Sequence, residues 1–175
     1  ISPAGSMSKF REKYPNRFIN TGVAEQSMVG IASGMALDGM RPIIHTISPF
    51  LVERAFEQIK NDIGYQNTEV TIVTVGGTYD YADLGCTHHC YGDVAMMRLI
   101  PNMQVFEPST PKELRTLFES PIQQIFNFEI DFFIISSTVK MSDKTCVGCD
   151  DGLKPLIIGI DKYFLKSSIF LSLSV

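Results

Sequence analysis

Apolar residues in the first 120 positions follow two alternating periods, one typical of strands and one typical of helices. Four short apolar or β-branched runs predict strands, at 18–20, 42–47, 70–75 and 103–106. Between the first two runs, apolar side chains recur every three or four residues, at Met28, Ile31, Ala32 and Met35. This spacing predicts a helix over 25–37 that ends at Gly39.

Further helical patterns follow the second, third and fourth apolar runs. Pro49 suits the first turn of a helix, and one apolar face follows it at Val52, Ala55, Phe56, Ile59 and Ile63. Helices are also predicted around 93–99 and after Thr110, where Thr110-Pro111-Lys112-Glu113 has the form of a capping box. Strands alternating with helices through short links predict an α/β fold, with a parallel sheet covered by helices on both faces.

The pattern changes after about residue 120. The segment 122–139 is rich in Phe and Ile, and 167–175 is a low-diversity run of Ser, Leu, Ile and Phe. We therefore divide the chain into a domain at 1–120 and a diverged tail at 121–175, although Phe132-Phe133-Ile134-Ile135 is a candidate strand. We expect the tail to be the less ordered part, which a protease cleaves first. A structured tail particular to this protein is the alternative.

Composition and charge narrow the classes of partner. With 175 residues the chain is long enough for one domain with a core, and a net charge of −4 provides no basic field for nucleic acid. The most apolar late stretch, 153–175, contains Asp161, Lys162 and Lys166, so no membrane span is expected. No signal-peptide pattern opens the sequence. The four cysteines are therefore interpreted as reduced thiols, and the location is predicted to be cytoplasmic.

Glu25 is the first candidate for chemistry, within Gly22-Val23-Ala24-Glu25-Gln26. An acid that opens a helix buried against a sheet is costly unless something occupies its carboxylate. The same acid also complements the helix dipole, which is a purely structural role.

Four sequence blocks resemble one enzyme family. They stand in order within 10–118 and are Arg17-Phe18-Ile19-Asn20 with Gly22-Val23-Ala24-Glu25-Gln26, Arg54-Ala55-Phe56-Glu57-Gln58-Ile59, Gly85-Cys86-Thr87-His88-His89, and Arg98-Leu99-Ile100-Pro101-Asn102. Together they resemble the pyrimidine-binding domain of the thiamine-diphosphate enzymes of the transketolase family. The resemblance implies transfer of a two-carbon ketol unit. 1-Deoxyxylulose-5-phosphate synthases and the β subunits of 2-oxoacid dehydrogenases share much of the pattern and are the alternatives.

The resemblance also implies roles for individual residues. Glu25 would activate the aminopyrimidine of thiamine diphosphate through the ring nitrogen N1′, and Phe50 would stack on that ring. Ile47 replaces a second aromatic and would give apolar contact only. His88 would face the reacting oxygens of the substrate. Two positions depart from transketolase, since Gly76 stands where a sugar-contacting His is expected and Leu84 where an Asp is expected.

The same resemblance predicts half of a site. The family's Gly-Asp-Gly followed by Asn, which holds Mg²⁺ and the diphosphate, is absent from the sequence. The metal and the diphosphate are therefore expected on a diphosphate-binding partner domain or subunit of a homo- or hetero-oligomer, with a sugar phosphate or 2-oxoacid as substrate. The chain also resembles a fragment that begins after the family's first strand and helix.

Three further interpretations concern particular residues or the chain as a whole. Cys86 and Cys90, with Cys146 and Cys149 or His88, have the residue types of a Cys₄ or Cys₃His zinc site, which would make the chain a metal-stabilised binding module. The chain is also compatible with an inactive remnant of a family enzyme. Arg54 and Glu57 are predicted to form a solvated or subunit-facing ion pair rather than to act on substrate.

Overall fold

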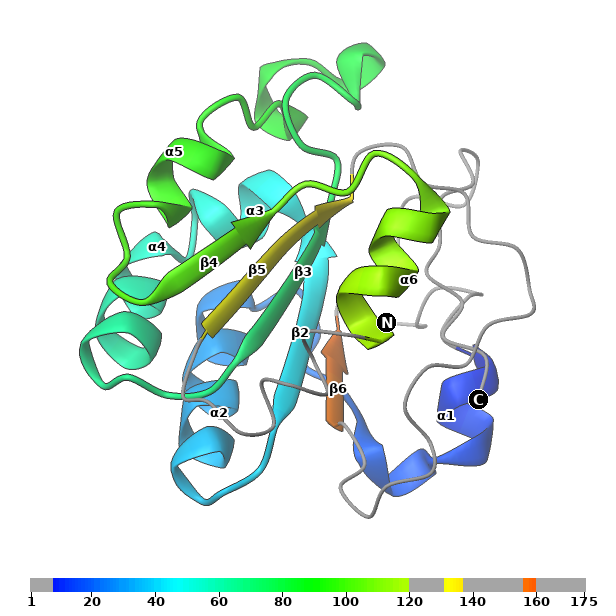
Figure 1. The fold of residues 1–175 in the computed structure, drawn as a ribbon, viewed down its shortest axis with the longest axis vertical. Coiled ribbons are helices and arrows are strands. Elements are labelled where there is room, and N and C mark those ends of the chain that lie inside the picture. Colours follow the sequence, from blue (N-terminus) through cyan, green and yellow to red (C-terminus); the bar gives the residue numbers. More distant parts are fainter. Residues whose placement is uncertain (1–7, 120–130, 137–155, 160–175) are drawn as a thin grey trace.

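A computed structural model describes residues 8–119, 131–136 and 156–159 (Figure 1). They contain one sheet of six strands in the order β1-β6-β2-β3-β5-β4. The strands are β1 (Phe18–Asn20), β2 (Pro42–Ile47), β3 (Thr71–Val75), β4 (Met103–Phe106), β5 (Asp131–Ser136) and β6 (Leu156–Gly159). All neighbouring strands pair in parallel, which confirms the predicted α/β fold.

Helices cover both faces of this sheet. The α-helices are α1 (Ser8–Lys13), α2 (Glu25–Leu37), α3 (Ser48–Val52), α4 (Phe56–Gln58), α5 (Asp93–Met97) and α6 (Pro111–Glu119). A π-helix follows α4 at Ile59–Tyr65, and 3-10 turns occur at Pro15–Arg17, Ala82–Leu84 and Cys86–His88. In Figure 1, α6 lies on the opposite side of the sheet from α2 and α5.

The segment after Pro49 differs from the single helix predicted there. It consists of α3, α4 and the π-helix in succession. The backbone N–H of Arg54 donates to the carbonyl of Pro49, five residues back, at 3.2 Å, and this wider turn interrupts the α-helical ladder. The predicted apolar face survives the interruption, because Val52, Ala55, Ile59 and Ile63 are all fully buried.

The buried face of α2 also differs from the predicted one. Met28, Val29, Ala32 and Ser33 point into the core, where Met28, Val29 and Ala32 belong to the same cluster as Ile44 of β2 and Ile72 of β3. Ile31 is instead 41% exposed. The buried stripe therefore follows residues 28, 29, 32 and 33, while Gly30, Ile31 and Gly34 face outward.

Two strands come from the part of the chain beyond residue 120. The candidate strand at 132–135 lies within β5, which pairs with β3 and β4. The later strand β6 pairs with β1 and β2. Both lie inside the sheet. The rest of 121–175 lies outside the described residues, so the division at residue 120 stays a prediction.

Candidate functional site

The candidate site lies at the carboxyl edge of the sheet, where three strands end and are followed by loops or helices. Strand β1 ends at Asn20, and α2 begins five residues later at Glu25. Strand β2 ends at Ile47 and leads directly into α3, which carries Phe50. The long loop after β3 carries His88. Because all strands are parallel, these three connections meet at one edge, where α/β folds place their ligands.

Glu25 is buried at the start of α2 with its two carboxylate oxygens in different surroundings. Its side chain is 1% exposed, and Oε2 accepts a hydrogen bond from Nη1 of Arg54 at 2.8 Å. Oε1 is buried and has no hydrogen-bond partner among the described residues. Such an orphaned oxygen is costly unless a ligand completes it. The turn before Glu25 is held by Asn20, whose Oδ1 accepts from the N–H of Gly22 at 2.9 Å.

Phe50 lies beside this ion pair and joins it to the loop after β3. The guanidinium carbon of Arg54 stands 4.5 Å from the centroid of the Phe50 ring. The His88 ring meets the Phe50 ring edge-on, with centroids 5.1 Å apart and an interplanar angle of 73°. Glu25, Arg54, Phe50 and His88 therefore form one continuous chain of contacts.

His88 is half-buried and has further neighbours within its own loop. Its Nδ1 lies 2.9 Å from the hydroxyl of Thr87, and the Tyr81 ring stands edge-on with centroids 6.4 Å apart. The loop is closed by two backbone hydrogen bonds between Thr78 and Cys90, at 3.0 and 2.8 Å. His88 is thereby held on the Phe50 side of the site.

Gly76 and Tyr81 fit together at the start of this loop. Gly76 has φ of +76°, and a Cβ added there would collide with the ring of Tyr81. Burial, together with the nearby Asp80, raises the pKa of Tyr81 above its usual value, so its hydroxyl is a neutral hydrogen-bond donor. The departure noted at Gly76 thus has a physical reason, since Tyr81 occupies the space that a side chain at residue 76 would need.

The remaining predicted residues take different places. Ile47 is the last residue of β2 and is partly buried. The expected pair of Arg54 with Glu57 is wrong, because Arg54 pairs with Glu25 and covers Phe50. Sequence reasoning therefore missed Arg54 as a site residue. Its place in the Arg54–Ile59 block, four residues after Phe50, was the signal that could have identified it.

The predicted zinc ligands that lie among the described residues do not form a metal-binding cluster. Cys146 and Cys149 lie outside the described residues, and within the described ranges no three His, Cys, Asp or Glu side chains gather as a metal site. Burial raises the pKa of the Cys90 thiol to about 12, which favours the neutral form over the thiolate that zinc binds. The described ranges also contain no helix with the length and apolar character needed to cross a membrane.

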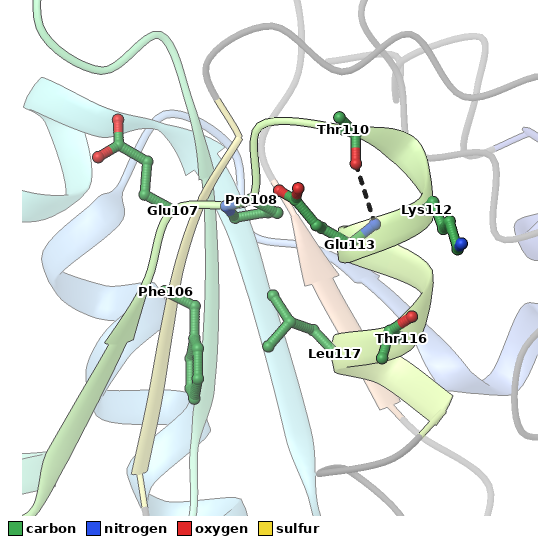
Figure 2. A pocket seen from close by; sticks show the side chains of 8 residues that line it. All are labelled: Phe106, Glu107, Pro108, Thr110, Lys112, Glu113, Thr116 and Leu117. Atoms are coloured by element: carbon green, nitrogen blue, oxygen red, sulfur yellow. Dashed lines mark hydrogen bonds between the residues drawn. The ribbon is translucent and has the colours of Figure 1, made fainter.

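A separate pocket of about 620 Å³ lies between the end of β4 and α6 (Figure 2). Two of its polar lining residues cap the start of α6. The N–H of Glu113 donates to the Thr110 hydroxyl at 3.2 Å, and the Glu113 carboxylate accepts from the N–H of Ser109 at 2.7 Å. These are capping interactions. The pocket contains none of the predicted site residues, so we do not assign the site there.

Comparison with protein families and relatives gives a consistent result. The family model described as "Transketolase, pyrimidine binding domain" matches residues 4–130. The chain is 39% identical over 119 residues to one subunit of an apulose-4-phosphate transketolase of Actinobacillus succinogenes, covering 68% of this chain and 38% of that protein. It is 40% identical over 114 residues to a 1-deoxy-D-xylulose-5-phosphate synthase of Symbiobacterium thermophilum, covering 65% and 17%. The chain therefore spans well under half the length of these relatives.

Solved structures show the same likeness. A split-gene transketolase, solved as an inactive β4 tetramer, superposes with a TM-score of 0.66 at 29% identity, over 83% of this chain and 45% of that one. A transketolase of Campylobacter jejuni gives a TM-score of 0.58 at 15% identity, over 74% of this chain and 24% of that one, and supports the fold alone.

Proposed function

This chain belongs to the family of transketolase pyrimidine-binding domains, and we propose that it supplies the pyrimidine-binding half of a thiamine-diphosphate site. The observation that carries the proposal is Glu25, buried at the carboxyl edge of the sheet with one oxygen lacking a partner among the described residues. A buried carboxyl oxygen with an aromatic ring close by fits a planar ligand that offers a polar ring nitrogen.

Each site residue receives a role toward that ligand. Thiamine diphosphate, when bound, supplies the carbon nucleophile that attacks a carbonyl substrate. Glu25 would hold the pyrimidine nitrogen N1′ by a hydrogen bond. Phe50 would stack on the pyrimidine, and Ile47 at the end of β2 would add apolar contact. His88, in contact with Phe50, would face the substrate and handle its protons near neutral pH.

The other half of the site is assigned to a partner. The sequence carries no Gly-Asp-Gly motif for Mg²⁺ and diphosphate, so we place both on a diphosphate-binding domain or subunit. Two similar proteins support this arrangement, since one is named as a transketolase subunit and another as a split-gene transketolase. The proposed assembly is an oligomer with the cofactor between the two kinds of domain.

The reaction proposed first is transfer of a two-carbon ketol unit between sugar phosphates. The similarity to 1-deoxy-D-xylulose-5-phosphate synthase favours, as the second candidate, a reaction in which a 2-oxoacid is the donor. The Tyr81 ring fills the space beside Gly76, at the position where the transketolase resemblance leads us to expect a sugar-contacting His. This difference from transketolase bears on the choice between the two reactions. An inactive remnant remains the alternative to both reactions.

Reconstitution distinguishes these possibilities. The full chain is mixed with the diphosphate-binding subunit of a split-gene transketolase, Mg²⁺ and thiamine diphosphate. A ketose phosphate or a 2-oxoacid is then offered with an aldose phosphate acceptor, and products are identified by mass. Ketol transfer supports the first reaction, and a 2-oxoacid-derived product supports the second. If the assembled, cofactor-bound complex forms neither product, the remnant interpretation replaces both.

A further inference from the structure

Arg54 contacts two of the proposed site residues at once, although no motif assigns it a role. Its Nη1 donates to Glu25 Oε2 at 2.8 Å, and its guanidinium carbon lies 4.5 Å from the Phe50 ring centroid. We propose that Arg54 is a positioning residue that fixes Glu25 and Phe50 relative to each other, holding Oε2 so that Oε1 is the oxygen offered to the cofactor. This inference rests on the proposed function and adds a residue to it.

The geometry of a guanidinium group suits both contacts. It is planar, it donates hydrogen bonds within its plane, and its faces stack on aromatic rings. Arg54 can therefore bind the carboxylate at its edge while one face covers Phe50. A lysine ammonium offers one compact charge and no face for stacking. Arginine is thus the basic residue that makes both contacts together.

The backbone explains how Arg54 reaches this place. Phe50 lies in α3, and Arg54 follows it by four residues in the link between α3 and α4. The wide turn, in which the N–H of Arg54 reaches the Pro49 carbonyl, lies between α3 and α4. Arg54 therefore sits where the helical ladder is interrupted, at the edge of the site.

Because Glu25 is buried, its contact with Arg54 matters more than an ion pair on the surface would. The Glu25 side chain is 1% exposed, whereas that of Arg54 is 42% exposed. Glu25 therefore exchanges few hydrogen bonds with water, and Arg54 is its one ion-pair partner among the described residues. Without Arg54, both Glu25 carboxylate oxygens would lack a hydrogen-bond partner among the described residues. No described contact would then determine which of the two oxygens faces the cofactor.

The first test concerns the pair itself and needs no cofactor. In the full chain, Arg54→Gln is expected to lower Tm, because it leaves the buried Glu25 charge unpaired. In a Glu25→Gln background, the same change should shift Tm little. Arg41→Gln, which breaks the partly exposed Arg41–Glu69 pair at 3.5 Å away from the site, serves as the control. Equal effects of Arg54→Gln in both backgrounds would overturn the inference and leave the proposed function intact.

The second test uses the chain with its diphosphate-binding subunit. Arg54→Ala should weaken thiamine-diphosphate affinity, measured by calorimetry, and lower kcat by about 10- to 100-fold through misplacement of Glu25. Added guanidinium ion should restore part of the affinity and part of the kcat that Arg54→Ala loses. The Arg54→Lys variant should retain less affinity and kcat than Arg54→Ala regains with guanidinium. Arg41→Ala should behave as the native complex.

The outcomes separate the two proposals. Native affinity and kcat in Arg54→Ala would overturn the positioning role alone. Losses that guanidinium does not relieve would also overturn it, because they would indicate a general structural defect. The third outcome is that the first test shows coupling between Glu25 and Arg54, yet the complex of the unsubstituted chain binds no thiamine diphosphate. That outcome would overturn the proposed function and the inference with it.

Discussion

At the scale of residues, the site depends on a few side chains whose surroundings are unusual for their type. Glu25 is an acid with 1% exposure, and its Oε1 has no partner among the described residues. Gly76 has a positive φ and lies against the ring of Tyr81. Departures from ordinary packing of this kind concentrate at functional sites, where a ligand or a neighbouring group compensates for them.

Replacing Glu25 tests the proposed chemistry. Glu25→Ala in the reconstituted complex should lower kcat by about 10²–10⁴, the usual effect of removing a well-placed proton-handling group. The measurement is steady-state turnover at saturating cofactor. Glu12→Ala, on the exposed side of α1, is the control and should keep native turnover. Full activity of Glu25→Ala would show that another acid performs this role.

Replacing Gly76 tests the loop that carries His88. Gly76→Ala should lower the free energy of unfolding by about 1–3 kcal/mol, because its φ of +76° disfavours a side chain and the added Cβ meets Tyr81. Gly34→Ala is the matched control, since no atom lies within 4 Å of the added Cβ in helix α2. That change should raise stability by about 0.5–1 kcal/mol. Denaturant unfolding of both variants measures the difference, and equal effects would contradict the account of Gly76.

At the scale of elements, the first residues of two helices determine where the Glu25 carboxylate and the capping groups of α6 lie. Helix α2 begins at Glu25, immediately after a turn held by Asn20 and Gly22. Helix α6 begins after Thr110 with a capping arrangement in which Glu113 reaches the N–H of Ser109. This differs by one residue from the usual capping box, where the acid returns to the N–H of the cap residue itself.

The cap of α6 can be tested separately from the site. Thr110→Ala should lower the free energy of unfolding by about 0.5–2 kcal/mol, because the N–H of Glu113 loses its acceptor. Thr116→Ala, at an exposed position of the same helix, should be neutral or raise stability by less than about 0.7 kcal/mol. Urea unfolding followed by circular dichroism gives both values. A Thr110 effect no larger than the Thr116 effect would argue against the cap.

Local patterns in the sequence predicted most of these elements, and the failures have physical causes. The strands at 42–47 and 103–106 and the helix at 25–37 were confirmed, because their period and flanking residues agree. The prediction of one continuous helix after Pro49 was wrong. The wide turn at Arg54 interrupts the helix but leaves the spacing of the apolar residues unchanged, so the pattern gave no sign of it. The Arg54–Glu25 pair was missed because it joins residues 29 positions apart. Side-chain pairing over that separation is determined by packing and is absent from local pattern.

At the scale of the whole molecule, the sheet joins early and late parts of the chain. Strand β5 lies between β3 and β4, as Figure 1 shows. Strand β6 lies between β1 and β2. The carboxyl edge that carries Glu25 and Phe50 thus belongs to a sheet whose order depends on both segments. In the proposed function, the residues at this edge provide the pyrimidine side of the site. Mg²⁺ and diphosphate contacts, which are charge-assisted and strong, are assigned to the partner.

The central claim, that this chain is one half of a thiamine-diphosphate site, is tested most directly by calorimetric titration. Thiamine diphosphate with Mg²⁺ is titrated into the full chain alone, and then into the chain mixed with the diphosphate-binding subunit of a split-gene transketolase, with that subunit alone as the control. The account predicts no tight binding by the chain alone and micromolar or tighter binding by the mixture, beyond what the other subunit achieves by itself. Micromolar binding by the isolated chain, or no gain in affinity on mixing, would contradict it.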